Sequence, residues 1–185
     1  ATEDNSDGTV TVTTGGVENS QDVTITLNGQ AYTGSVSSNS ATVTITASAL
    51  QALTDGNTYS LTADVSDVAG NAAAQVTSAS FTVDTTVPTI SAIATSAFSW
   101  GSHLNATEDN SDGTVNVTTS GVENGQVVTI TLNSATYTAI VSSDAATVTI
   151  TASGLQALSE GSETLTADVS DVAGNAAAQV TSASF

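Results

Sequence analysis

Carboxylates are the only side chains in this sequence whose number and grouping suggest chemistry. The chain of 185 residues carries 18 Asp and Glu side chains and one His, and it has no Lys, Arg or Cys. Because no Lys or Arg can form a salt bridge, we expect water, backbone N–H groups or an external cation to stabilise these carboxylates. The lack of basic residues also excludes a phosphate clamp, a nucleic-acid surface and a basic patch for anionic membranes.

The acids are grouped, and the groups recur along the chain. The first group, Glu3, Asp4 and Asp7, is repeated as Glu108, Asp109 and Asp112. Further matches are Glu18 with Glu123, Asp64 with Asp168, Asp67 with Asp171, and Asn71 with Asn175, while the equivalent of the linker residue Asp84 would fall after residue 185.

A long internal repeat explains this recurrence. The sequence ATEDNSDGTV occupies residues 1–10 and returns at residues 106–115, about 105 residues later. Such a period is the size of a whole domain and far exceeds the roughly 20–50 residues of a solenoid repeat. We therefore predict two domains, residues 1–85 and 86–185, that meet at a linker, Asp84–Pro88, containing the only proline. The first domain is expected to lack its opening strand, and the last strand of the second is expected to be truncated.

The local pattern predicts an all-β chain. Thr alternates with Val, Ile or Leu, as in residues 22–27, and Gly or Asn clusters separate these runs. Short strands at this density predict tandem immunoglobulin-like β-sandwiches, with about seven strands per ~104-residue repeat. The first strand of the second domain is expected at Thr89–Ala97. Ala49–Leu53 is the exception and predicts one helical turn that closes an end of the sandwich.

The expected topology places the grouped acids at the ends of the sandwich. In an immunoglobulin-type fold, the loops after the second and sixth strands lie where the chain enters, and the loop after the first strand lies at the opposite end. The linker and the far end of the preceding domain should therefore meet the entry end of the next one. We expect up to seven carboxylates at this joint: Asp84, Glu123, Asp168, Asp171, Glu3, Asp4 and Asp7.

A divalent cation would relieve the repulsion in such a joint. Two like charges about 4 Å apart repel by about 1 kcal/mol in water and about 4 kcal/mol at an effective dielectric constant of 20. Ca²⁺ accepts about 6–8 oxygen ligands in flexible geometry, whereas Mg²⁺ needs near-ideal octahedra and Zn²⁺ prefers Cys and His. The alternative is that these acids only solvate loops or form turns, as for Asp7 and Asp55, which each precede a glycine.

Three short motifs connect the chain with a known family. They are DVAGN at Asp67–Asn71, VDTTVP at Val83–Pro88 and VENGQ at Val122–Gln126. With these motifs the chain resembles the bacterial Ig-like extender repeats of giant RTX adhesins, of the biofilm-forming and ice-binding type. The resemblance implies type I secretion, display on the bacterial cell surface, and Ca²⁺ at interdomain linkers. Matched by position, it implies Asp84, Glu123 and Asp171 as the main ligands, supported by Asp168, Asn175, Glu3 and Asp4.

The leading hypothesis for function is therefore a structural extender whose joints are made rigid by Ca²⁺. Its expected partners are neighbouring repeats of the same chain, with no nucleic acid, no direct membrane contact and no small-molecule substrate. The alternative is an adhesion module that binds ice or carbohydrate.

The residues that could serve such a module have ordinary explanations. Thr9, Thr11 and Thr13 form a regular row, but outward strand positions give the same pattern. Trp100 could stack on a sugar, but its position beside Phe98 favours packing. A Ser-His-Asp triad could form only around the single His103. Paired carboxylates could form a glycosidase site, but the acids are grouped in loops at domain ends without a groove of aromatic residues, so we expect no enzyme.

Overall fold

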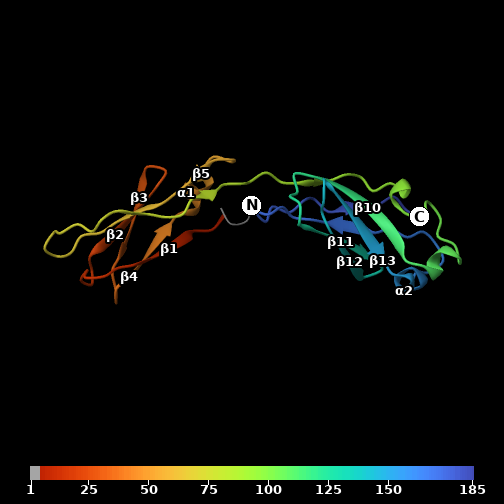
Figure 1. Ribbon diagram of the computed structural model, residues 1–185, viewed down its shortest axis with the longest axis horizontal. Helices are drawn as coiled ribbons and strands as arrows, with labels where there is room; N and C mark the ends of the chain where they lie inside the picture. The colour runs from red at the N-terminus through yellow and green to blue at the C-terminus, as the bar shows by residue number, and fades with distance from the viewer. Residues whose placement is uncertain (1–4) are drawn as a thin grey trace. The chain divides into compact units, whose positions relative to one another are not determined.

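The computed structural model describes residues 5–185, and the chain divides into two compact units, Ala1–Thr85 (unit 1) and Thr86–Phe185 (unit 2). Unit 2 is a β-sandwich in which a three-stranded sheet, β13-β10-β9, faces a four-stranded sheet, β12-β11-β14-β15 (Figure 1). All of its strand pairs are antiparallel. The strands are β9 (Thr89–Ile90), β10 (Gly113–Ser120), β11 (Val127–Leu132), β12 (Ala135–Ile140), β13 (Ala145–Ile150), β14 (Thr166–Asp168) and β15 (Val180–Thr181).

Unit 1 repeats this arrangement without a strand equivalent to β9 among its described residues. A two-stranded sheet, β1-β4, accompanies a four-stranded sheet, β3-β2-β6-β7, and β5 pairs separately with β8. Its strands are β1 (Gly8–Thr13), β2 (Asp22–Leu27), β3 (Gln30–Ser35), β4 (Ser40–Ile45), β5 (Thr58–Tyr59), β6 (Thr62–Asp64), β7 (Val76–Thr77) and β8 (Phe81–Thr82). The all-β prediction of immunoglobulin-like sandwiches with about seven strands is confirmed.

Period-two alternation buries one face of each long strand. In β11, Val128, Ile130 and Leu132 are at most 1% exposed, while the Thr residues between them are only partly buried. β13 alternates in the same way and contributes Val148 and Ile150 to the core. These side chains belong to a buried cluster made only of unit 2 residues, and unit 1 has a separate cluster around its own β2 and β4. Each unit therefore has its own hydrophobic core.

One helical turn closes each sandwich, as the sequence predicts. These turns are α1 (Ala47–Gln51) and α2 (Ala152–Gln156). Leu155 in α2 is 2% exposed and joins the core of unit 2, whereas its counterpart Leu50 in α1 is only partly buried. No helix among residues 5–185 is long and apolar enough to cross a membrane.

The segment Pro88–Trp100 differs from its predicted form. Only β9 is strand, and Thr95–Ala97 forms a short 3-10 helix, η2, so the expected strand over Thr89–Ala97 is wrong in its length. The segment begins on β10, where Ser91 N–H donates to Thr118 O at 2.9 Å. It then crosses to the segment that follows β15 of the other sheet, where Ala183 N–H donates to Ile93 O at 2.8 Å. A continuous strand would stay paired with β10. Because the segment changes its hydrogen-bonding partner from β10 to Ala183, β9 ends at Ile90.

Three aromatic rings fix the end of this segment. Trp100 stacks on Phe98 with ring centroids 5.1 Å apart and planes 10° apart, and Phe185 meets both rings edge-on. Trp100 is 6% exposed, which confirms the packing role predicted for it and leaves no exposed face for a sugar. Apolar burial and ring geometry both stabilise this cluster.

Gly113 provides a test of the aromatic packing. A Cβ placed there would lie 2.6 Å from Trp100 Cζ3, whereas one placed at the matching Gly8 would lie 3.2 Å from the flexible Leu50 Cδ1. We expect Gly113→Ala to destabilise unit 2 by about 1–3 kcal/mol, because a packed ring must move to admit the methyl group. Gly8→Ala should change the stability of unit 1 by less than about 1 kcal/mol, since Leu50 can rotate away. Urea unfolding of the two variants would measure this difference, and equal effects would contradict it.

Candidate metal-binding carboxylates

Glu123 joins two loops at one end of unit 2. Its Oε2 accepts a hydrogen bond from Val172 N–H at 2.9 Å, which holds the loop after β10 against the turn that follows β14. Glu18 makes the same bond to Val68 N–H in unit 1, at 3.0 Å. The structure thus brings together the two loops that the topology places at one end. The carboxylate already has a structural role there, because it satisfies a backbone donor in a loop.

Asp171 and Asn175 close the turn formed by the DVAGN motif. Asp171 Oδ1 accepts from Asn175 N–H at 2.7 Å, and Oδ2 accepts from Asn175 Nδ2 at 2.8 Å. Asp171 is 4% exposed and Asn175 is 1% exposed. A carboxylate this deep in a protein needs hydrogen-bond donors or a cation, and here the asparagine supplies two donors. Asp67 and Asn71 make the same two bonds in unit 1, where Asn71 is exposed.

Asp168 is held by an amide that the sequence analysis did not identify. Gln179 Nε2 lies 3.0 Å from Asp168 Oδ1 and 2.9 Å from Oδ2. The same contact links Gln75 to Asp64 in unit 1. In both copies the Gln follows the Asp by 11 residues, a spacing that the repeat preserves and that could have indicated the pair.

The acids before β10 lie at the other end of that strand. Asp112 Oδ1 accepts from Ala152 N–H at 2.9 Å, at the start of α2, and Asp7 does the same for Ala47 N–H in unit 1. Both carboxylates satisfy a donor that a helix start leaves unpaired. Asp7 thus has a partner in the helical turn α1, far from its own loop in the sequence. Glu108 Oε2 accepts from both nitrogens of Asn105, and Glu108 and Asp109 belong to the 3-10 helix η3 (Glu108–Asn110).

The predicted calcium site remains a prediction. Among residues 5–185 no group of three or more His, Asp or Glu side chains is placed to hold a metal ion. The predicted site draws on both units, and Glu3 and Asp4 lie outside the described residues. Within unit 2 the structure does place Glu123 next to the turn that contains Asp171. The chemistry of these oxygen donors fits Ca²⁺, since a carboxylate that accepts hydrogen bonds keeps further lone pairs for a cation.

Asp67 should make the stability of unit 1 sensitive to acid. Hydrogen bonds from the side chain and backbone of Asn71 lower the pKa of this carboxyl below its usual value. The contribution of the ionised Asp67 to the stability of unit 1 is therefore complete above the ordinary pKa of about 3.9. It is lost as the pH falls through the lower pKa of the folded state. Between about pH 5 and pH 2 we expect the melting temperature of unit 1 to fall less in Asp67→Asn than in the parent chain. The same fall in both would contradict the assignment, and Asp144→Asn, in unit 2, is the control.

Two other candidate groups, His103 and the threonine row of β1, lie in ordinary surroundings. His103 is exposed in a loop, with Nδ1 3.0 Å from Oγ of the adjacent Ser102. Thr9, Thr11 and Thr13 are exposed on β1 and lie opposite Thr44, Thr42 and Ser40 of β4. Outward positions on a solvated sheet face account for this row.

Among the known proteins compared with this chain, only solved structures are similar to it. No protein-family profile matches the chain, and no curated protein matches it. One similar structure is described as a Ca²⁺-stabilised adhesin that helps an Antarctic bacterium to bind ice, at 26% identity and a TM-score of 0.48. Another is from a 1.5-MDa bacterial ice-binding adhesin, at 28% identity and a TM-score of 0.48. The two alignments cover 100% and 98% of this chain. They cover only 44% and 57% of the two adhesin chains, so this chain spans about half of their length.

A third structure bears on the fold. The fibronectin(III)-like modules of CbhA from Clostridium thermocellum align with 96% of this chain and 83% of theirs, at 11% identity and a TM-score of 0.52. This likeness indicates the β-sandwich fold and nothing about function. The chain is thus similar both to structures from ice-binding adhesins, as its motifs predict, and to fibronectin(III)-like modules.

Proposed function

We propose that this chain is a structural extender from a cell-surface adhesin, in which tandem Ig-like domains are made rigid by Ca²⁺ at their joints. One observation supports the proposal above all others. The same sandwich occurs twice in a chain with 18 acidic and no basic residues, and each copy repeats the same loop carboxylates. A repeat that adds length needs a core of its own, which each unit has, and it needs no catalytic group. Its partners would be neighbouring repeats, at the surface of a bacterium that exports it by type I secretion.

Calcium would be held by the carboxylates of the loops and the linker. The main candidates are Asp84, Glu123 and Asp171, supported by Asp168, Asn175, Glu3 and Asp4. The hydrogen bonds of Asp171 and Glu123 support this choice, because they fix two carboxylates on loops at one end of unit 2 before any ion arrives. Acids fixed in this way lose less conformational entropy on binding than free ones.

Thermal unfolding of the full chain with and without calcium tests the proposal. Extracellular calcium modules bind with Kd values of about 10⁻⁴–10⁻³ M. At about 10 mM Ca²⁺ each site should then stabilise the folded state by about 1.4–2.7 kcal/mol relative to EDTA. We expect small-angle scattering to show a narrower range of end-to-end distances in Ca²⁺. The same melting and scattering in both solutions would reject calcium-dependent rigidity.

A matched pair of variants separates a specific site from general charge screening. Asp84→Asn should lower the stabilisation by Ca²⁺ at least threefold. Asp144→Asn removes the same charge from a hairpin turn, and the matching residue of unit 1 is already Asn39 in the same left-handed conformation, with φ of 63° against 60° for Asp144. It should leave the calcium response unchanged. Equal responses of the two variants would exclude Asp84 as a ligand.

Ice or carbohydrate binding remains the second candidate. The exposed threonine rows of β1 and β4 are the observation in its favour. An ice-recrystallisation assay and a glycan array test it, and we expect both to be negative.

A further inference from the structure

The chain contains two Asn-Gly dipeptides that the structure holds in different ways. They are Asn28-Gly29 and Asn124-Gly125, and each is followed by glutamine. Asn28 and Gly29 form the two-residue turn between β2 and β3, with φ of 48° and 77°. Both asparagines are exposed, so neither the residues that follow them nor access to water distinguishes the two sites.

An asparagine followed by glycine can modify itself. The backbone nitrogen of the glycine attacks the side-chain carbonyl carbon of the asparagine, the amide leaves as ammonia with the proton of that nitrogen, and a cyclic imide forms. Water then opens the imide at either carbonyl and gives aspartate or iso-aspartate, so the net reaction exchanges ammonia for water. Glycine favours the attack because it has no Cβ to block the approach of its nitrogen. The reaction therefore needs an asparagine side chain that can rotate and a glycine N–H that is not bound elsewhere.

Hydrogen bonds hold Asn124 and Gly125 away from this geometry. Asn124 Oδ1 accepts from Ser143 N–H at 2.8 Å, and Gly125 N–H donates to Val141 O at 3.0 Å. Both bonds must break before the nitrogen can reach the side-chain carbonyl, so the reactive conformation is rarely populated. The same two bonds recur in unit 1 at Asn19-Ser20, which shows that they belong to this loop of the fold.

Asn28 and Gly29 are not held in this way. Within the described part of the chain, neither the Asn28 side chain nor the Gly29 N–H has a hydrogen-bond partner. β3 is the edge strand of its sheet, so the turn lies at a hairpin tip, the kind of site that opens locally at low cost. In unit 2 the matching residues are Asn133 and Ser134, and Asn133 Nδ2 donates to Ala157 O at 3.1 Å.

From this contrast we propose that Asn28 is a site of spontaneous covalent modification, at which the side-chain amide is converted through a cyclic imide to aspartate and iso-aspartate, while the fold protects Asn124. The reaction consumes only water and adds a negative charge to a chain whose net charge is already −18. Iso-aspartate also adds one atom to the backbone of a turn whose length sets the register of two strands.

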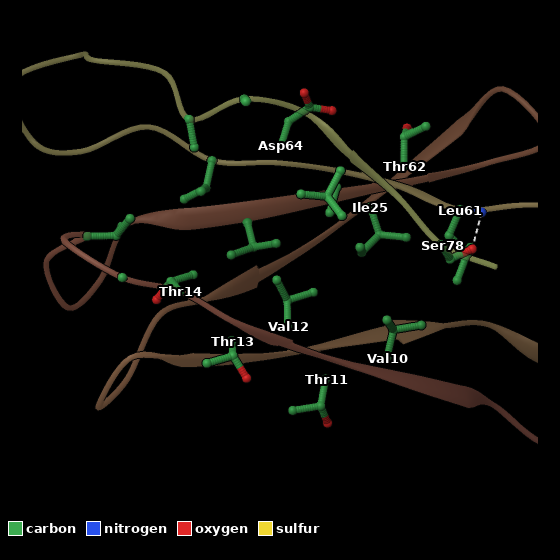
Figure 2. Close-up of a pocket in the computed structure, with 18 residues that line it drawn as sticks. Val10, Thr11, Val12, Thr13, Thr14, Ile25, Leu61, Thr62, Asp64 and Ser78 are labelled. Atoms are coloured by element: carbon green, nitrogen blue, oxygen red, sulfur yellow. Dashed lines mark hydrogen bonds between the residues drawn. The ribbon is translucent and has the colours of Figure 1, made fainter.

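The modification acts on unit 1 because β2 carries much of its core. Val23, Ile25 and Leu27 are at most 2% exposed. Figure 2 shows Ile25 directed into a hollow of unit 1 that Val10 and Val12 also line. A change of register would turn the inward side chains of a strand to its other face. The lengthened turn should therefore destabilise unit 1 and leave unit 2, with its separate core, unaffected.

Peptide mapping of the aged full chain tests the proposal. After incubation in mildly alkaline buffer, acid stops the reaction and pepsin cleaves the chain, which trypsin cannot do without Lys or Arg. Mass spectrometry then measures the conversion of each asparagine. We expect conversion at Asn28 to be at least about tenfold faster than at Asn124, where two hydrogen bonds must break. Equal rates, or a faster reaction at Asn124, would overturn the proposal.

Two controls separate the fold from the local sequence. In concentrated urea the rates at Asn28 and Asn124 should become equal, and slow conversion of Asn124 in the unfolded chain would reject protection by the fold. Gly29→Ser reproduces the matching turn of unit 2, where Asn133 and Ser134 have φ of 47° and 65°, so the variant should fold. Its conversion at Asn28 should be at least about fivefold slower, because the added side chain hinders the attacking nitrogen. An unchanged rate would exclude attack by that nitrogen.

Thermal melts test the effect on unit 1. Once Asn28 has been converted, the melting temperature of unit 1 should fall by at least about 4 °C in calorimetry. The fluorescence transition of the only tryptophan, Trp100, which is buried in unit 2, should stay in place. The Gly29→Ser chain, aged in the same way, should keep both transitions. Equal losses in the parent chain and the variant, or no loss in either, would reject the structural effect of the modification.

Discussion

Heating the full chain should give two separate unfolding transitions, with unit 1 melting first. The two hydrophobic cores are distinct, and among the described residues no segment covers unit 1 as residues 88–100 cover unit 2. Leaving a single large apolar side chain uncovered costs about 1.5–3 kcal/mol. In a domain of about 100 residues, 1 kcal/mol changes the melting temperature by about 4–8 °C. With several core residues uncovered in unit 1, we expect the transitions to lie at least about 10 °C apart.

The single tryptophan assigns these transitions without dissecting the chain. Trp100 is buried in unit 2, so its fluorescence should change only in the upper transition, whereas circular dichroism and calorimetry should report both. Gly8→Ala and Gly113→Ala provide an independent assignment, because Gly113→Ala should lower the upper transition and Gly8→Ala should leave it in place. One cooperative transition by every probe, or a tryptophan signal in the lower transition, would contradict the prediction.

The fold was predictable where local pattern determines it. Alternation of Thr with Val, Ile and Leu predicts β2 and β11 because each inward position is apolar and each outward one polar. Asn28-Gly29 predicts the tight turn between β2 and β3, and both residues do adopt positive φ, of 48° and 77°. Residues 89–97 were harder, since Ile90 and Ile93 lie three apart and the segment changes its hydrogen-bonding partner between them. Hydrogen bonding to two different segments is a tertiary property that local alternation does not encode.

The location of the candidate site could be predicted from the sequence, but the hydrogen-bond partners of its carboxylates could not. Topology correctly places Glu123 beside the turn after β14, because loops at one end of a sandwich meet. It does not reveal that Asp171 is bound by Asn175, or that Asp168 is bound by Gln179. A carboxylate that accepts an amide proton and one that binds a cation have the same sequence signature. Only the positions of the neighbouring donors distinguish them, and these depend on the folded loops.

The chain contains two copies of one repeat, so each copy serves as a control for the other. Asp67 and Asp171 make the same hydrogen bonds to the asparagine that follows, yet only Asp171 is buried. Val10 and Val115 likewise occupy the same repeat position, and only Val115 is fully buried. Because the local sequence is shared, residues 88–100, which pair with β10 in unit 2, rather than the strands themselves, account for the difference in burial at Val10 and Val115. The stability of each repeat should therefore depend on the chain that precedes its first long strand.

Phe98→Ala tests this dependence directly and should be among the most damaging single substitutions in unit 2. Phe98 is 5% exposed, stacks on Trp100 and meets Phe185 at 5.1 Å. Truncating a buried Phe costs about 3–5 kcal/mol, part of it from the cavity that remains. The upper transition should then fall by at least about 12 °C, while the lower one stays unchanged. Val172→Ala, at a side chain 69% exposed, is the control and should change stability by no more than about 0.5 kcal/mol. If both variants melted alike, the segment that contains Phe98 would contribute little to the core of unit 2.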